Sequence, residues 1–170
     1  MSAPPNGIRI AQTIGITAAA FVAGGTLCIS YHETPSLLLS PYPLIVRQWK
    51  KSFDVGKIAH PGIALVSMVA YGYLAYQMKG TLNQHKAEMY GLCWLANAAI
   101  WPWTLVVMMP TNRKLFKKHE EIERNPEISE TGVAKGESAG ELIRSWSKMN
   151  IVRGCFPLVA AALGAWASLG

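Results

Sequence analysis

The sequence predicts an all-α protein, a four-transmembrane-helix bundle with an amphipathic interfacial helix and a helical cytoplasmic connection between spans three and four. Of its 170 residues, 51% are hydrophobic and only 15% are charged, whereas soluble domains are about a quarter charged. The charged residues are also absent from four long stretches, which are residues 10–31, 58–78, 89–112 and 154–170. Since about 20 mostly apolar residues cross the hydrocarbon core of a bilayer, each stretch is long enough for one span or nearly so.

We expect the spans at about residues 10–31, 58–78, 89–109 and 151–169, in a single integral membrane domain that covers residues 1–170. The alternative is a soluble bundle, but soluble helices carry a polar face that these stretches lack. The first span is longer than the apolar core of a signal peptide, which has about 7–15 residues, so we expect an uncleaved anchor.

The connections between the spans are predicted in chain order from prolines, charge and helical periodicity. Residues 33–43 hold three prolines and predict an irregular connection. Residues 44–57 are amphipathic and predict an interfacial helix that leads into span two. Residues 113–124 favour helix, whereas residues 126–140 are rich in Ser, Gly and charge and predict a mobile loop. Helix resumes near Ala139 and leads into span four.

The distribution of Lys and Arg predicts the orientation in the membrane. Three of these residues, Arg9, Lys79 and Lys86, fall on one side, and the other thirteen fall on the opposite side. The positive-inside rule then places the long connections in the cytoplasm and both termini in the lumen. We expect the endoplasmic reticulum or another intracellular membrane, with the lipid bilayer as a partner. No nucleic-acid partner is expected, because no basic stripe is interleaved with aromatic residues.

Span three predicts one continuous helix face that bears large aromatic side chains and one amide. Its members, at positions i, i+4, i+7, i+11 and i+14, are Tyr90, Trp94, Asn97, Trp101 and Thr104. Polar groups inside a bilayer are costly and therefore mark functional candidates. The structural alternative is bundle packing for the aromatic rings and a hydrogen bond to a neighbouring helix for the amide.

Polar residues also gather near the cytoplasmic ends of the other spans. His60 and Tyr71 share a face of span two, and Asn150 and Arg153 lie one turn apart at the start of span four. Together with Asn112, these ends would meet around one cavity, which the aromatic face of span three would floor. The alternatives are an interfacial histidine without a task and an arginine that extends to the headgroups.

Several chemistries fail on their residue requirements. Cys28, Cys93 and Cys155 lie singly on three spans, so no C-x-x-C pair is present and packing is their expected role. A bis-histidine haem would need His32 and His60 at one depth, but His32 lies at a loop edge. Clustered metal ligands, phosphate loops and nucleophile elbows are also missing. The composition therefore favours a site without cofactor or metal for an apolar, aromatic small molecule.

Two segments carry a resemblance to a known family. Residues 103–115 read W-T-L-V-V-M-M-P-T-N-R-K-L, which resembles the P-[YFW]-T…M-P-T-N-x-x-L segment of the anthrone oxygenase-like membrane proteins of fungal polyketide gene clusters. Residues 142–154 read L-I-R-S-W-S-K-M-N-I-V-R-G and are similar to the W-x-x-x-N-x-x-R helix of that family. The sequence departs from the family pattern at residues 52–56 and at residues 31–33, which are unusually polar for the end of span one.

Weaker matches extend the resemblance over nearly the whole chain. They are Trp49, Gly56, Pro61 and Ala64 in a W…G…P-x-x-A pattern, and Gly24 and Gly25 followed by Pro35. The resemblance implies a four-helix membrane fold and a monooxygenase of secondary-metabolite biosynthesis. Its reaction would be oxidation of an anthrone to an anthraquinone by dioxygen, without a bound cofactor.

Roles for individual residues follow from what that reaction needs. A base must remove the anthrone methylene proton, and a cation must stabilise the enolate oxygen. His60 is the expected base because histidine has an unperturbed pKa near 6.5; His32, oriented by Glu33, is the runner-up. Arg153 with Asn112 or Asn150 would stabilise the oxyanion. The expected substrate-binding residues are Trp94, Asn97, Trp101, Trp103, Tyr71, Asn112 and Asn150.

Two other functions remain open from the sequence. A membrane-bound cyclase or isomerase of natural-product biosynthesis would use the same pocket without dioxygen. A non-catalytic membrane scaffold would instead bind other pathway enzymes through residues 113–148. Consumption of dioxygen separates the oxygenase from the cyclase or isomerase, and deletion of the loop at 126–140 would harm only the scaffold.

Overall fold

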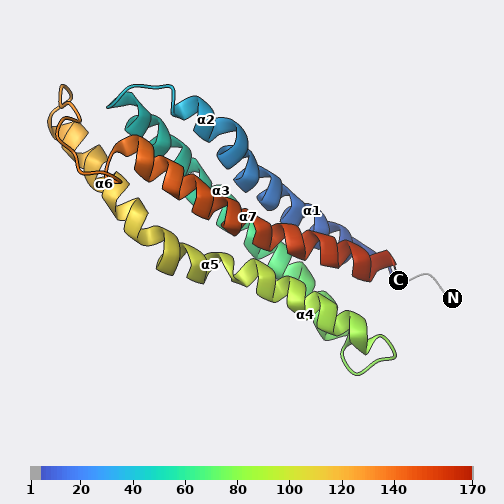
Figure 1. The fold of residues 1–170 in the computed structure, drawn as a ribbon. Helices are drawn as coiled ribbons and strands as arrows, with labels where there is room; N and C mark the ends of the chain where they lie inside the picture. Colours follow the sequence, from blue (N-terminus) through green and yellow to red (C-terminus); the bar gives the residue numbers. More distant parts are fainter. Residues whose placement is uncertain (1–4, 170) are drawn as a thin grey trace.

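The computed structural model describes residues 5–169, which form four long antiparallel helical rods (Figure 1). The first rod comprises α1 (Asn6–Cys28), the π-helix η1 (Ile29–Glu33) and α2 (Thr34–Leu37), and the second rod is α3 (Leu44–Met78). The third rod comprises α4 (Gln84–Ala98), α5 (Ile100–Trp103), the π-helix η2 (Thr104–Met108) and α6 (Met109–Arg124). The fourth rod is α7 (Ala139–Leu169). All four are long and apolar enough to cross a membrane. No strand occurs among residues 5–169. The predicted all-α bundle of four spans is therefore confirmed.

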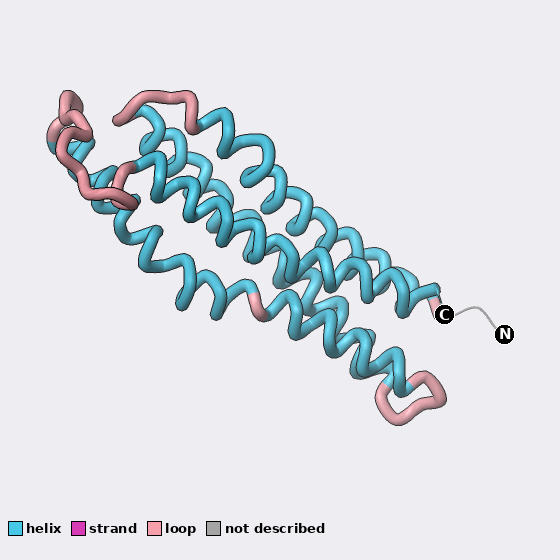
Figure 2. Tube along the Cα trace, viewed as in Figure 1, coloured by secondary structure: helices cyan, strands magenta, loops and turns pink. Residues whose placement is uncertain are grey.

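The bundle has two distinct ends (Figure 2). The connections 38–43 and 125–138 lie together at one end, which we call the loop end. The short turn at 79–83 lies at the other end, together with Pro5 and Leu169, and we call this the terminal end. Packing follows a ring, because α1 contacts α3 and α7, and α4 contacts the same two helices from the opposite side.

Two predicted boundaries are corrected. The irregular connection expected over 33–43 begins only after Leu37, because η1 and α2 carry the first rod past Pro35. Proline has no N–H and crowds the preceding helical turn. A π-helix immediately before Pro35 widens that turn, and the Thr34 hydroxyl donates to the Ile29 carbonyl at 2.9 Å. The predicted interfacial helix over 44–57 is the first part of the unbroken helix α3.

The third rod is interrupted, which corrects the continuous face expected for span three. Helix α4 ends at Ala98, and a one-residue break at Ala99 comes three residues before Pro102. Within α4 itself, Tyr90 and Asn97 are fully buried, while Trp94 is 40% exposed. These side chains do not form one inward stripe.

The connection 125–138 is fastened to the helices beside it. The Lys118 ammonium lies 2.6 Å from the Glu130 carboxylate, which also accepts the Ala139 backbone N–H at 2.8 Å. Burial, followed by the charges of Glu130 and Glu121, raises the pKa of the Tyr42 phenol. Tyr42 therefore remains a neutral ring at physiological pH, beneath the Lys118 ammonium at 6.0 Å from its centroid.

Candidate active site

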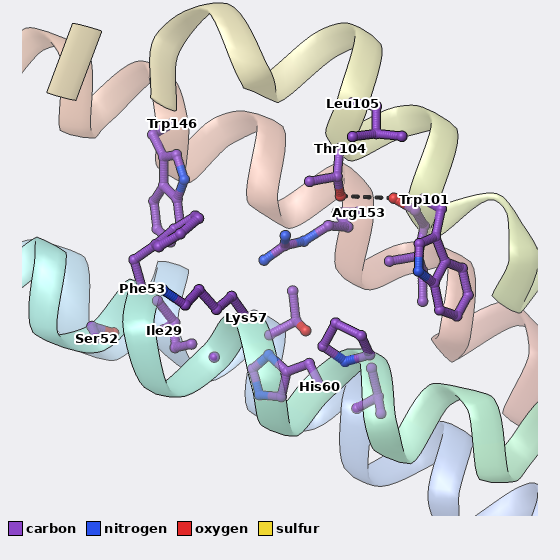
Figure 3. A pocket seen from close by; sticks show the side chains of 15 residues that line it. Ile29, Ser52, Phe53, Lys57, His60, Trp101, Thr104, Leu105, Trp146 and Arg153 are labelled. Carbon is purple, nitrogen blue, oxygen red and sulfur yellow. Dashed lines mark hydrogen bonds between the residues drawn. The ribbon is translucent and has the colours of Figure 1, made fainter. Parts of the chain in front are cut away.

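A cavity of about 150 Å³ lies within the bundle, between α1, α3, α7 and the α5–η2 segment (Figure 3). We call it the first cavity. Its apolar wall includes the rings of Phe53, Trp101 and Trp146. Two of its polar side chains, His60 and Arg153, face one another across the open space (Figure 3). An apolar cavity with a few convergent polar groups is the usual form of a small-molecule site.

Arg153 brings an unpaired positive charge into this cavity. Its guanidinium donates to the Asn150 side-chain oxygen at 2.5 Å, and no carboxylate of residues 5–169 lies within 4.0 Å of it. The amide nitrogen of Asn150 in turn donates to the Thr26 carbonyl at 2.9 Å and to the Ser30 hydroxyl at 2.8 Å. Asn150 therefore anchors Arg153 to α1 and leaves the rest of the guanidinium available to an anionic or strongly accepting oxygen.

Two glycines lie against the His60 ring and leave room for it. A Cβ atom on Gly25 would lie 2.9 Å from His60 Nε2, and one on Gly56 would lie 3.7 Å from Nδ1. Real Cβ atoms do not approach so closely as the first distance, so α1 accommodates the imidazole only because residue 25 has no side chain. Pro61 follows directly within α3 and also lines the cavity.

A second cation at the cavity is already neutralised. Lys57 lines the cavity, and its ammonium lies 2.6 Å from the Asp54 carboxylate. Asp54 also pairs with Lys50 at 2.5 Å. Figure 3 shows the Lys57 side chain directed toward Phe53, whose ring centroid is 6.0 Å from the ammonium. Arg153 is thus the cation that remains for a ligand.

A second cavity, of about 520 Å³ and more open than the first, adjoins it on the side of η1 and α2. Four residues line both cavities, and they are Ile29, Ser52, Gly56 and His60. The remaining wall includes the polar side chains of Glu33, Gln48 and Lys51. His60 therefore lies in the partition between the two cavities.

The structure brings together three of the ten residues predicted from the sequence, because His60, Arg153 and Trp101 all line the first cavity. Asn150 joins them through its hydrogen bond to Arg153. His32 is exposed on η1 and lines neither cavity.

The other five predicted residues lie outside the lining of the first cavity. Tyr71 donates to the Ala160 carbonyl at 2.9 Å, and Asn97 donates to the Cys93 carbonyl at 3.1 Å. The Trp103 indole donates to the Met149 carbonyl at 3.0 Å. Trp94 faces outward, and Asn112 is buried in α6. The break at Ala99 separates α4 from the cavity, so the aromatic face does not form its floor.

Sequence reasoning missed Phe53, Gly56 and Lys57 on α3 and Trp146 on α7. A signal existed for the first three. Together with His60 they occupy positions i, i+3, i+4 and i+7, which is one face of a single helix. Dividing residues 44–78 into an interfacial helix and a span hid this face at the boundary between residues 57 and 58.

The described residues offer no clear metal site. Within residues 5–169, no group of three or more His, Cys, Asp and Glu side chains is close enough to hold a metal ion. Apart from the neutralised Lys57 and three hydroxyl side chains, the polar groups at the first cavity are one imidazole and one guanidinium. These can exchange a proton and stabilise a negative charge on a bound molecule.

Comparison with known proteins identifies the family of this chain. The sequence profile described as "Anthrone oxygenase" matches residues 49–163. The chain belongs to the anthrone oxygenase family. The matched region contains the residues of α3, α5 and α7 that line the first cavity, His60 and Arg153 among them.

Several named relatives match over most of their length. The anthrone oxygenase nsrD of Aspergillus novofumigatus is 28% identical, over 88% of this chain and 87% of its own. The anthrone oxygenase encC of Aspergillus fumigatus is 28% identical, over 93% and 92%. The monooxygenase hypC of Dothistroma septosporum is 29% identical, over 90% and 80%. No solved structure matches the chain. These relatives confirm the prediction of an anthrone oxygenase-like enzyme.

Proposed function

We propose that this protein is a membrane-bound oxygenase that oxidises an anthrone-like polyketide with dioxygen and without a bound cofactor. The observation that carries the proposal is the pairing of His60 and Arg153 across an apolar cavity with an aromatic wall. The names of the relatives supply the substrate class, since they are anthrone oxygenases and a monooxygenase.

The first step is removal of a proton from the substrate. The methylene of an anthrone is acidified by the ketone across the central ring, and neutral histidine is a suitable base near pH 7. His60 accepts this proton and becomes an imidazolium. The negative charge moves to the ketone oxygen, where Arg153, held by Asn150, stabilises it. The apolar wall excludes water and so strengthens this interaction.

The second step is the reaction with dioxygen. The enolate transfers one electron to dioxygen, and the resulting carbon radical and superoxide combine, taking up one proton from solvent, to give a hydroperoxide at the former methylene. Loss of the remaining C–H proton then breaks the O–O bond and releases water. One anthrone and one dioxygen yield one anthraquinone and one water, so no further reductant or oxidant is required.

The membrane location and orientation are part of the same proposal. The loop end, which carries most of the Lys and Arg residues, would face the cytoplasm, and the terminal end would face the lumen of the endoplasmic reticulum or another intracellular membrane. A hydrophobic substrate would then reach the cavity from the bilayer. Contacts with other pathway enzymes would occur at the loop end.

The decisive experiment uses the detergent-solubilised protein with emodin anthrone in an oxygen electrode, with metal and flavin assays on the same sample. Uptake of dioxygen above the autoxidation blank, with neither metal nor flavin in stoichiometric amount, is the expected result. Without uptake the cofactor-free oxygenase is wrong, and a cyclase or isomerase that uses the same base and cation becomes the better function.

A further inference from the structure

The second cavity has no part in the two steps above, yet His60, the base of the first step, also lines it. A base must lose its proton before it can act again. The proton therefore needs a path away from His60, on the side of one cavity or the other.

The first cavity offers no acceptor. Its charged residues are Arg153 and Lys57, and both are cations. The nearest carboxylate on that side, Asp54, is held by Lys50 at 2.5 Å and by Lys57 at 2.6 Å. A carboxylate that already accepts from two ammonium groups is a weak proton acceptor. An imidazolium at position 60 would therefore have only positively charged side chains near it on the substrate side.

The second cavity offers both an acceptor and room for water. Glu33, from η1, lines it together with His60, from α3. The Glu33 carboxylate has no ion pair or side-chain hydrogen bond within the described residues 5–169, and it lies beyond 4.0 Å from His60. The volume of about 520 Å³ admits water, and Ser52, Gln48 and Lys51 supply polar partners for it.

Glu33 reaches the second cavity because of the face of the first rod on which it lies. The sequence pairs Glu33 with its neighbour His32, but the structure turns His32 outward and places Glu33 in the cavity wall. Gly25, Ile29 and Glu33 follow one another at four-residue intervals along the first rod. Gly25 contacts the His60 ring and Ile29 lines both cavities, so this face leads from the imidazole to the carboxylate.

We propose that Glu33 carries the proton from His60 to bulk water through the second cavity. The imidazolium N–H passes its proton to a water molecule, and this water protonates the Glu33 carboxylate. Glu33 then releases the proton at the open side of the cavity. Only protons move, so the step needs no oxidant or reductant. The inference rests on the proposed role of His60 as the base, and Glu33 is a proton-transfer residue of the same reaction.

The test measures proton exchange in the absence of dioxygen. Anthrone is incubated with the purified full-length protein in heavy water under argon, and incorporation of deuterium at the methylene is followed by mass spectrometry. The base removes a methylene proton and returns a deuteron only if it exchanges with solvent in between. We expect Glu33→Gln to slow incorporation by about tenfold or more, and Glu33→Asp to retain most of it.

Added imidazole and a matched carboxylate provide the controls. Imidazole is small enough to carry protons in the second cavity, so it should restore exchange in Glu33→Gln in proportion to its concentration. Glu120 is exposed on α6 at the same end of the bundle and lines neither cavity. Glu120→Gln removes the same charge and should exchange at the wild-type rate, with or without imidazole.

The outcomes separate this inference from the proposed function. Wild-type exchange in Glu33→Gln, or slow exchange that imidazole does not restore, overturns the role of Glu33. No exchange by the wild-type protein, or undiminished exchange in His60→Ala, overturns both the base and the route. Exchange without dioxygen uptake in air leaves the proton route standing and removes the oxygenase.

Discussion

The two ends of the bundle treat their polar residues in opposite ways. At the terminal end, each buried hydroxyl has a protein partner: Tyr71 donates to Ala160, and Tyr90 joins Gln12 and Ser168 at 2.9 and 3.1 Å. At the loop end, Arg153 has no carboxylate, and the indole nitrogens of Trp49 and Trp146 have no partner among residues 5–169.

This difference assigns separate tasks to the two ends. A polar group that is satisfied by its own protein holds helices together but is not available to a ligand. A buried group without a partner costs about 1–3 kcal/mol of stability. Arg153 and Trp146 line the first cavity, where a bound molecule can use them. The comparison predicts that substitutions at the terminal end reduce stability, whereas substitutions at the first cavity reduce turnover.

The largest effect is expected from removal of the two polar groups of the first cavity. His60→Ala should lower dioxygen uptake by about 10²- to 10⁴-fold through loss of the base. Arg153→Leu should lower it by about 10²- to 10³-fold through loss of oxyanion stabilisation. The free energy of unfolding should change little in either variant.

The matched control for the arginine is Arg144→Leu, since Arg144 is exposed on the same helix and should leave turnover unchanged. Full turnover in both His60→Ala and His32→Ala would show that neither histidine is the base. If the loss of turnover in Arg153→Leu were fully explained by a loss of folded protein, the proposed division between the two ends would be wrong.

The next effect concerns the close packing at the terminal end. Gly164→Ala should destabilise the protein by about 1–3 kcal/mol, because the new Cβ would lie 2.7 Å from Cε1 of the buried Tyr71 ring. Titration with a denaturing detergent, followed by circular dichroism, measures the change.

Gly24→Ala is the control for this variant, because no atom outside its own helical turn lies within 4 Å of the Cβ position. It should be neutral or stabilising by up to about 1 kcal/mol from helix propensity. The same destabilisation in both variants would show that close packing against Tyr71 is not the cause.

The sequence predicted the bundle well because charge spacing alone determines which segments can lie in hydrocarbon. It could not predict how far each helix extends beyond the apolar segment, since a helix such as α3 continues into water without a change of backbone. It also misjudged Pro35 and Pro102. Proline permits a helix end, a break or a π-helix, and only the surrounding packing selects among them.

Only part of the candidate site was predicted from the sequence. His60 and Arg153 were found because polar groups are rare inside apolar spans. Trp94 and Asn97 were placed with them on the assumption that span three is a straight helix, and the break at Ala99 removes that assumption. Tyr71, on α3, lies at the terminal end instead, where it donates to the Ala160 carbonyl. Glu33 was tied to its sequence neighbour His32, although the four-residue spacing of Gly25, Ile29 and Glu33 places it on the helix face that meets His60.

A smaller effect is expected from one hydrogen bond at the terminal end. Tyr71→Phe removes the hydroxyl that donates to the Ala160 carbonyl at 2.9 Å and keeps the ring. Hydrogen bonds between membrane helices contribute about 0.6 kcal/mol on average, so a loss of this order is expected in the detergent titration. Tyr76→Phe, on a ring that is 78% exposed, should have no effect. A loss of turnover that exceeds the loss of stability would contradict a purely structural role for Tyr71.

The smallest effect compares two ion pairs that fasten the connection 125–138. Lys118 and Glu130 are each 15% exposed, whereas Lys114 and Glu137 are 51% and 43% exposed. Exposed pairs contribute about 0–1 kcal/mol and are screened by salt. Glu137→Gln should therefore be nearly neutral. Glu130→Gln should cost more, because Glu130 also accepts the Ala139 N–H at the start of α7. Unfolding at low and high salt measures both. Equal and fully salt-sensitive losses would show that Glu130 acts only as a surface charge, and that the connection does not help to hold α7 beside the first cavity.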